Sequence, residues 1–136
     1  MQQVHEGGCY CGAVRYRVSG PPRRVGACSC RWCQRRTGSV LGMSVYFEAS
    51  DLDYLQGALR HVPLTSGSGR SIETDFCPTC ATTVGWTMEA EPGAQGIAGG
   101  TFDDPALWQP QRFVFTRTKP GWLSACDAVP DYEALP

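Results

Sequence analysis

The sequence of 136 residues is poor in several features, and each shortage argues against a class of protein. No apolar run approaches the ~18 residues that a membrane-spanning helix needs. The first residues lack the basic and apolar regions of a secretory signal peptide, so we expect a cytoplasmic protein with no membrane partner. Lys119 is the single lysine, which argues against a surface that binds nucleic acid. His5 and His61 have no second histidine at ligand spacing, so we expect ordinary surface or core positions for both.

Glycine, proline and cysteine are abundant instead, with 16, 10 and 8 residues. So many turn residues favour short strands over long helices, and the length fits one domain over residues 1–136. Alternating or β-branched stretches predict strands at 13–18, 40–47, 58–64 (ending at Pro63), 82–87, 95–100 and 113–116. The segments between them predict a strand edge or turn at 51–57, a flexible loop at 65–70 that runs into the next cysteine pair, and a metal-binding loop at 28–37 with a helical turn at 34–36. The expected fold class is therefore mainly β, with antiparallel strands.

Seven of the eight cysteines fall into three tight groups, and Cys126 stands alone. The groups are Cys9 and Cys11; Cys28, Cys30 and Cys33; and Cys77 and Cys80. Such short spacings let neighbouring sulfurs reach one metal ion, and in a reducing compartment they indicate zinc rather than disulfides. Buried thiols or a redox dithiol are the alternatives, but a redox site needs one pair between a strand and a helix, not three groups among turns. Spacing alone leaves an iron–sulfur cluster open. The lone Cys126 is expected to be a small buried hydrophobic residue.

Seven clustered thiolates divide into four and three, and the sequence allows two divisions. Cys30 and Cys33 with the Cys77 and Cys80 pair would make an ordinary zinc ribbon, which leaves three cysteines unused. The second division joins the first and last pairs into a closed four-cysteine site and keeps the middle group together. We prefer it because three ligands from one loop can hold a second zinc with an open position, as catalytic zinc sites do.

Basic residues are concentrated in the first forty positions, where seven arginines against one acid give a net charge of +6. The remaining residues carry five basic and twelve acidic side chains, a net charge of −7. One interpretation is compensation for the five thiolates in the same stretch. The other is recognition of an anionic substrate, because a guanidinium binds a carboxylate in a bidentate fork. Arg31, Arg35 and Arg36 flank the middle cysteine group and are the best candidates for such a role.

The cysteine motifs and two later segments resemble the glutathione-dependent formaldehyde-activating enzyme family, which includes the centromere protein V type. The resemblance covers nearly the whole chain. The segments that carry it are Gly8-Cys9-Tyr10-Cys11-Gly12-Ala13-Val14-Arg15-Tyr16, Cys28-Ser29-Cys30-Arg31-Trp32-Cys33-Gln34-Arg35-Arg36-Thr37-Gly38, Phe76-Cys77-Pro78-Thr79-Cys80, Gly100-Thr101-Phe102-Asp103-Asp104-Pro105, and Lys119-Pro120-Gly121-Trp122-Leu123 followed by Asp127 and Pro130.

This resemblance implies two zinc sites, a fold and an activity. The first and last cysteine pairs would hold a structural zinc, and Cys28, Cys30 and Cys33 would hold a catalytic one. The implied fold is a set of coiled antiparallel β-sheets around the structural zinc, similar to methionine sulfoxide reductase B and the Rab nucleotide-release accessory proteins. The implied activity is carbon–sulfur lyase chemistry, in which glutathione and formaldehyde form S-(hydroxymethyl)glutathione.

Three positions depart from the family pattern. Ser29 stands where members often have histidine, Ala81 where they usually have glycine, and Arg112 where a late histidine is expected. None of these is a cysteine ligand. The alternative function is a zinc module without catalysis, which binds a thiol compound or a protein partner.

Overall fold

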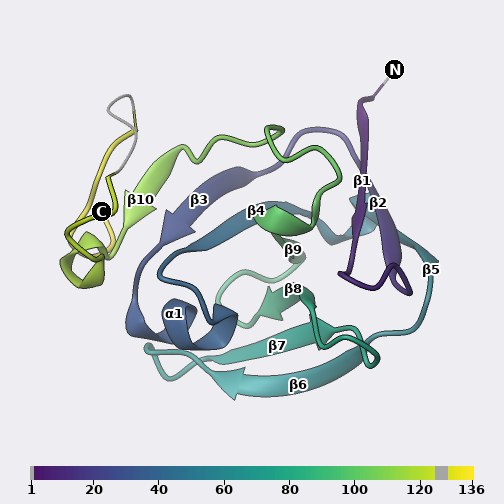
Figure 1. Cartoon of the computed structure of the whole chain (residues 1–136), viewed down its shortest axis with the longest axis horizontal. Helices are drawn as coiled ribbons and strands as arrows, with labels where there is room; N and C mark the ends of the chain where they lie inside the picture. The colour runs from purple at the N-terminus through teal and green to yellow at the C-terminus, as the bar shows by residue number, and fades with distance from the viewer. Residues whose placement is uncertain (1, 125–128) are drawn as a thin grey trace.

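The computed structural model describes residues 2–124 and 129–136, which form two β-sheets and one short α-helix (Figure 1). The smaller sheet has the strand order β1-β2-β5, and the larger has the order β10-β3-β4-β9-β8-β7-β6. The strands are β1 (Val4–Gly8), β2 (Arg15–Ser19), β3 (Arg24–Cys28), β4 (Gly42–Glu48), β5 (Leu52–Gln56), β6 (Arg60–Thr65), β7 (Ser71–Phe76), β8 (Thr83–Met88), β9 (Ala94–Ala98) and β10 (Arg112–Val114). The helices are α1 (Arg31–Thr37) and the 3-10 turns η1 (Ala49–Asp51), η2 (Gly99–Thr101) and η3 (Thr116–Thr118). The expected mainly β class is confirmed; β10 pairs with β3 in parallel, and the other strand pairs of the two sheets are antiparallel.

Alternation along the strands builds the core. In β2, Tyr16 and Val18 are fully buried, whereas Arg17 between them is exposed. β4 and β9 contribute Phe47 and Ile97 to the same cluster of buried side chains. Removing each such apolar side chain from water stabilises the fold by about 1.5–3 kcal/mol. The core therefore joins side chains of both sheets.

The predicted strands at 13–18, 40–47, 82–87, 95–100 and 113–116 correspond to β2, β4, β8, β9 and β10. The predicted edge at 51–57 contains β5, and the predicted helical turn is part of α1, which is longer than expected. Three strands, β1, β3 and β7, were not predicted; in β1 and β3, glycines and arginines interrupt an alternating pattern. No helix among the described residues is long and apolar enough to cross a membrane.

Two expectations around the β6–β7 hairpin are wrong. The strand does not end at Pro63 but continues to Thr65, with Pro63 paired in register with Glu73. β6 is the edge of its sheet, where one side of the strand needs no partner and a proline is tolerated. Residues 66–70 of the predicted loop form a tight turn in which the Ser66 N–H donates to the Arg70 carbonyl at 2.8 Å. It leads into strand β7 rather than directly into the cysteine pair.

Gly7 in β1 allows the smaller sheet to approach the segment after β9. A methyl group at this position would lie 2.4 Å from both the Thr101 carbonyl oxygen and the Tyr16 hydroxyl oxygen. The Tyr16 and Thr101 hydroxyls are themselves hydrogen-bonded at 2.9 Å, and Arg15 and Asp103 form a two-pronged ion pair alongside. The late glycine-threonine-phenylalanine-aspartate segment thus packs onto the strand that follows the first cysteine pair.

Substitution of Gly7 by alanine is expected to lower the free energy of unfolding by about 2 kcal/mol, because the added methyl group overlaps two oxygens. Urea denaturation followed by circular dichroism measures the change. Gly26→Ala is the matched control, since a methyl group there meets no atom within 4 Å. Equal effects of the two substitutions would show that the close approach at Gly7 does not limit stability.

Candidate metal centre and thiol site

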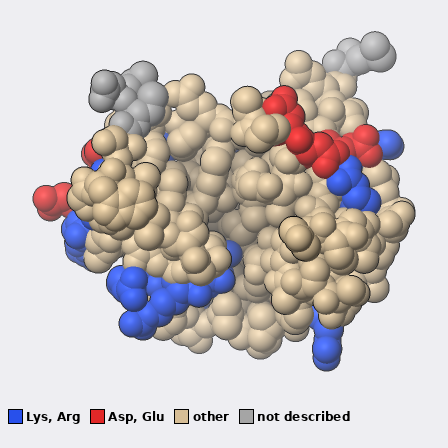
Figure 2. All heavy atoms as spheres, in the orientation of Figure 1, with Lys and Arg blue, Asp and Glu red and all other residues tan. Residues whose placement is uncertain are grey.

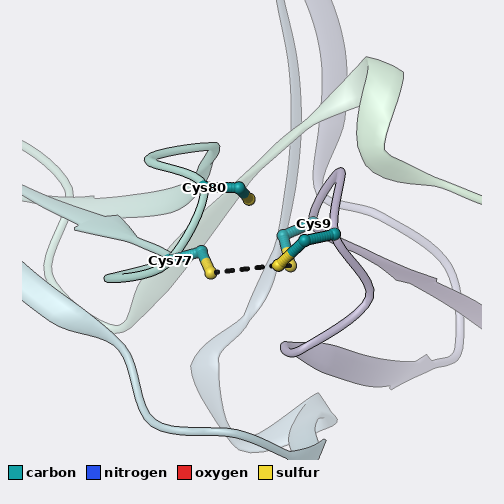
Figure 3. A group of neighbouring side chains, drawn as sticks. Cys9, Cys77 and Cys80 are labelled. Carbon is teal, nitrogen blue, oxygen red and sulfur yellow. Dashed lines mark hydrogen bonds between the residues drawn. The ribbon is translucent and has the colours of Figure 1, made fainter.

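Four cysteines converge from two turns that are distant in sequence (Figure 3). Cys9 and Cys11 lie in the turn between β1 and β2, and Cys77 and Cys80 in the turn between β7 and β8. The Sγ atom of Cys11 is 3.7 Å from that of Cys9 and 3.8 Å from that of Cys77. All four sulfurs lie within 4.8 Å of one another. The structure therefore groups the cysteines according to the second division, not that of a zinc ribbon.

The spacing of these sulfurs fits tetrahedral zinc. A Zn–S bond of about 2.3 Å places the corners of a tetrahedron about 3.8 Å apart, which is the separation observed for Cys11 and its two neighbours. Backbone N–H groups also point at the sulfurs: Val14 donates to Cys9 at 3.2 Å and Thr79 donates to Cys77 at 3.4 Å. A site of four thiolates with such donors has the chemistry of a closed structural zinc.

Hydrogen bonds also connect the two turns that carry these cysteines. The Tyr10 N–H donates to the Thr82 hydroxyl at 3.1 Å, and the same hydroxyl lies 3.1 Å from the Cys80 sulfur. Ala81, one of the departures from the family pattern, has a left-handed backbone with φ of 65°. Its N–H donates to the Cys77 carbonyl at 2.8 Å and closes the turn. Glycine adopts this conformation without steric cost, whereas alanine does not.

Substitution of Ala81 by glycine is expected to raise the free energy of unfolding by about 1 kcal/mol, because it removes the left-handed strain at the last turn. Urea denaturation at a fixed free zinc concentration measures this. Ala58→Gly serves as the control, since Ala58 is exposed and has no positive φ. At Ala58, glycine is expected only to increase the entropy of the unfolded chain and so to destabilise the protein. A stabilising effect there as well would contradict the assignment of the Ala81 effect to backbone strain.

The middle cysteines form a second group at the junction of β3 and α1. Cys28 is the last residue of β3, Cys30 caps the start of α1, and Cys33 lies in its first turn. The Cys30 N–H donates to the Cys28 sulfur at 3.5 Å, and the Cys33 N–H donates to the Cys30 sulfur at 3.3 Å. The three sulfurs lie within 4.8 Å of one another. These three sulfurs could supply three of the four ligands of a zinc ion.

The pKa values of the three thiols are shifted in opposite directions, so the thiols do not ionise equally readily. Hydrogen bonds from Cys28 and Cys33, with the N–H groups of Cys33 and Trp32, lower the pKa of Cys30 to about 2 despite its partial burial. Hydrogen bonds to Cys30 and Cys33, together with burial, raise the pKa of Cys28. The bond from Cys28 lowers the pKa of Cys33, and so does the charge of Arg36, but Cys30 and burial raise it by more. A bound dication would let all three thiols ionise together, because it favours the thiolate form of every ligand.

The four-cysteine group has the same uneven pattern. The Thr82 hydroxyl and backbone N–H lower the pKa of Cys80 to about 5. Burial raises the pKa of Cys9, but hydrogen bonds from Val14 and the neighbouring cysteines outweigh it and lower the pKa overall. The pKa of Cys11 is raised to about 11: the Ala13 N–H lowers it, but desolvation and the neighbouring sulfurs have the larger combined effect. Like the middle group, these four cysteines therefore offer thiolate sulfurs that suit a cation.

The segment after β10 fastens the middle loop to the rest of the fold. The Ser29 N–H donates to the Val114 carbonyl at 3.1 Å, and the Thr118 hydroxyl donates to the Ser29 carbonyl at 2.6 Å. Gln34, buried in α1, donates from its amide to the Thr118 carbonyl at 3.0 Å and to the Val40 carbonyl at 3.2 Å. Sequence reasoning missed Gln34 and Thr118, because neither belongs to a chemical motif. Their hydrogen bonds fix the loop that carries the three sulfurs.

The three candidate arginines all lie on α1, where basic side chains gather on the lower left face (Figure 2). Together with Trp32 they line a pocket of about 420 Å³ against the end of β6. Arg31 donates to the Gln34 side chain at 2.5 Å. Arg35 is exposed, and Arg36 stacks on the Trp86 ring, 4.2 Å from its centroid. In residues 2–124 and 129–136, none of the three forms an ion pair with a carboxylate.

Comparison with known proteins supports the assignment suggested by these sites. The family model described as glutathione-dependent formaldehyde-activating enzyme matches residues 4–118, which include all seven clustered cysteines. The chain belongs to this family. A crystal structure of a Rhodobacter sphaeroides protein has a similar fold, with a TM-score of 0.54 and 21% sequence identity over 93% of this chain and 98% of that one. At that identity the likeness concerns the fold alone.

The two histidines of this formaldehyde-activating family member lie outside both cysteine groups. His5 packs against the edge of Trp108 at 5.1 Å between ring centroids. His61 is exposed, as expected for a surface position, and faces Asp75 across the β6–β7 pair at 2.6 Å, with Glu73 at 3.9 Å. Its cross-strand register explains why the sequence did not reveal the contact. Ser29, at the position where members often have histidine, has a buried hydroxyl with no described partner. Cys126 and Asp127 lie outside the described residues.

Proposed function

We propose that this protein catalyses the condensation of formaldehyde with glutathione or a closely related thiol, and the reverse carbon–sulfur cleavage. The observation that carries the proposal is the incomplete group of Cys28, Cys30 and Cys33 beside a pocket lined by arginines. Three thiolates leave one coordination position open, as in catalytic rather than structural zinc sites. The family match supports glutathione and formaldehyde as the two substrates.

In this proposal the cysteines are ligands and the arginines bind substrate. Zinc at the three-cysteine group would supply a Lewis acid that favours a thiolate and polarises a carbonyl. The N–H groups of Cys30 and Cys33 stabilise the ligand sulfurs, and the loop is held by Gln34 and Thr118. Three thiolates and one dication leave a net charge of −1, which nearby arginine side chains offset. In Arg31, Arg35 and Arg36 the site has cations that can receive the carboxylates of glutathione.

The four-cysteine group has a structural role in the proposal. It joins the smaller sheet to the β7–β8 turn and has no open position. Zinc at both sites also fits a reducing, cytoplasmic location, because thiolate ligands must not be oxidised to disulfides. The seven described cysteines are unpaired thiols.

Exchange NMR between formaldehyde and its glutathione adduct tests the reaction. We expect the zinc-loaded protein to raise the exchange rate well above that of buffer, and we expect about two zinc ions per chain on metal analysis. Selective removal of the more labile zinc by a mild chelator is expected to return the rate to that of buffer without unfolding the protein. A buffer-like rate with two zinc ions bound would refute the proposed reaction. One tightly held zinc with no acceleration would instead support the module without catalysis.

A further inference from the structure

A second pocket, of about 360 Å³, shares Arg36 with the pocket described above. It lies between the end of α1 and the start of β8, which follows the four-cysteine turn. Thr37, Met43, Thr82 and Trp86 contribute to its lining. Arg36 lines both pockets and lies one helical turn after the zinc ligand Cys33. Arg36 is therefore shared by the two pockets, and of the residues assigned to the proposed reaction it is the one that lines the second.

Arg36 has hydrogen-bonding capacity that the described residues do not use. Its guanidinium carbon lies over Trp86, 4.2 Å from the ring centroid; the Trp86 ring is buried and its indole N–H donates to the Tyr46 hydroxyl at 3.0 Å. Stacking of this kind orients a guanidinium but leaves its N–H donors unpaired. The Arg36 Nη1 atom is buried with no acceptor among the described residues, and no described carboxylate pairs with the side chain. An unpaired buried donor is costly unless an acceptor enters.

Two of the other hydroxyl groups in this second pocket are already hydrogen-bonded. The Thr37 hydroxyl donates to the Cys33 carbonyl at 2.7 Å, and the Thr82 hydroxyl is shared between Tyr10 and Cys80. Met43 and the Trp86 ring supply apolar surface. No acidic side chain is among the residues that line the pocket. The pocket therefore suits an anionic group attached to a short apolar chain, and it has no acidic side chain that would bind an ammonium group.

The arginines of α1 are not equivalent in this respect. Arg31 is hydrogen-bonded to Gln34, and Arg35 is exposed and lines only the first pocket. Arg36 combines a cation–π contact with Trp86, an unpaired donor and a place one turn from Cys33. We propose that Arg36 is the carboxylate anchor of the thiol substrate, and that the second pocket makes the site selective for thiols that carry a carboxylate. This inference rests on the proposed function for the identity of the thiol.

A binding experiment separates this inference from the reaction itself. S-methylglutathione keeps both carboxylates but has no reactive thiol, and its diethyl ester has lost their charge. Isothermal titration of the zinc-loaded protein with both compounds measures their affinities for the wild type, Arg36→Gln and Arg36→Lys. Arg60→Gln is the matched control, since Arg60 is exposed at the start of β6 and lines neither pocket. Zinc content and melting temperature show whether each variant is folded.

We expect Arg36→Gln to weaken binding of S-methylglutathione by about 10- to 100-fold, as for loss of a charge-assisted hydrogen bond, and Arg36→Lys to weaken it less. The diethyl ester is expected to bind weakly and equally to all variants, and Arg60→Gln to match the wild type. Equal affinity of wild type and Arg36→Gln for S-methylglutathione would overturn the inference, even where exchange NMR shows the reaction. Absence of binding to the wild type would overturn it too. Arg36-dependent binding without accelerated exchange would uphold the anchor and refute the reaction.

Discussion

Substitution of Cys77 by serine is expected to leave the chain largely unfolded. Cys77 is fully buried, and its sulfur is 3.8 Å from that of Cys11 in the group that joins the two sheets. Binding of a structural zinc contributes about 10–16 kcal/mol in small zinc domains, whereas domains of this kind have a total stability of about 5–15 kcal/mol. Loss of one ligand from the closed site therefore removes a large share of the stability. Far-UV circular dichroism and zinc content per chain, measured at matched concentration, report the loss.

Cys28→Ser is the comparison that distinguishes the two sites. It changes a ligand of the open group at the end of β3, which joins no separate parts of the fold. We expect this variant to keep its strand signal and one tightly bound zinc. Unfolding of both variants to the same degree would contradict a division into one structural and one open site. Retention of the fold by Cys77→Ser would contradict the structural role of the four-cysteine group.

Cysteine spacing was the most informative part of the sequence. Pairs that are one or two residues apart must lie in tight turns, so the sulfurs of each pair share a direction before any tertiary structure is considered. The grouping of Cys9 and Cys11 with Cys77 and Cys80 then followed from leaving no cysteine unused, and the structure brings these four together. The mainly β class followed in the same way from many turn residues and short alternating runs.

Features that depend on pairing between distant segments could not be predicted from local patterns. Proline normally ends a strand. Pro63 lies in β6, the edge strand of the larger sheet, which pairs on one side with β7 and has no strand on its other side. His61 and Asp75 meet only because β6 and β7 are in that register. The stacking of Arg36 on Trp86 likewise joins a helix to a strand fifty positions later. These contacts are set by tertiary packing, which overrides local propensity.

The sequence identified three arginines as equal candidates because charge and proximity to the cysteines were its only criteria. Hydrogen bonding distinguishes them in the structure: the Gln34 side chain accepts from Arg31, whereas Arg36 retains an unpaired donor. The sequence did not identify Gln34 as a site residue, although its side-chain amide donates to the Thr118 carbonyl and so connects α1 to the segment after β10. The residues that position a site are therefore harder to recognise than those that carry its chemistry.

Substitution of Cys30 by alanine is expected to return formaldehyde exchange to the buffer rate while the chain stays folded. Cys30 is the central member of its group: it accepts the Cys33 N–H, and its neighbours lower its pKa to about 2, so it is the thiol most ready to bind a cation. Without it two ligands remain, too few to hold zinc with a defined open position. Metal analysis should then find about one zinc per chain, retained at the four-cysteine group.

Ser29→Ala is the control in the same loop. Its hydroxyl is buried without a described partner, so its removal costs no hydrogen bond and leaves the Cys28 and Cys30 sulfurs in place. We expect this variant to keep two zinc ions and at least the wild-type exchange rate, whereas Cys30→Ala should lose the second zinc and the acceleration together. Wild-type exchange in Cys30→Ala would show that the three-cysteine group is not the reaction centre. A loss of rate in Ser29→Ala with both zinc ions bound would instead place the serine hydroxyl in the chemistry of the site.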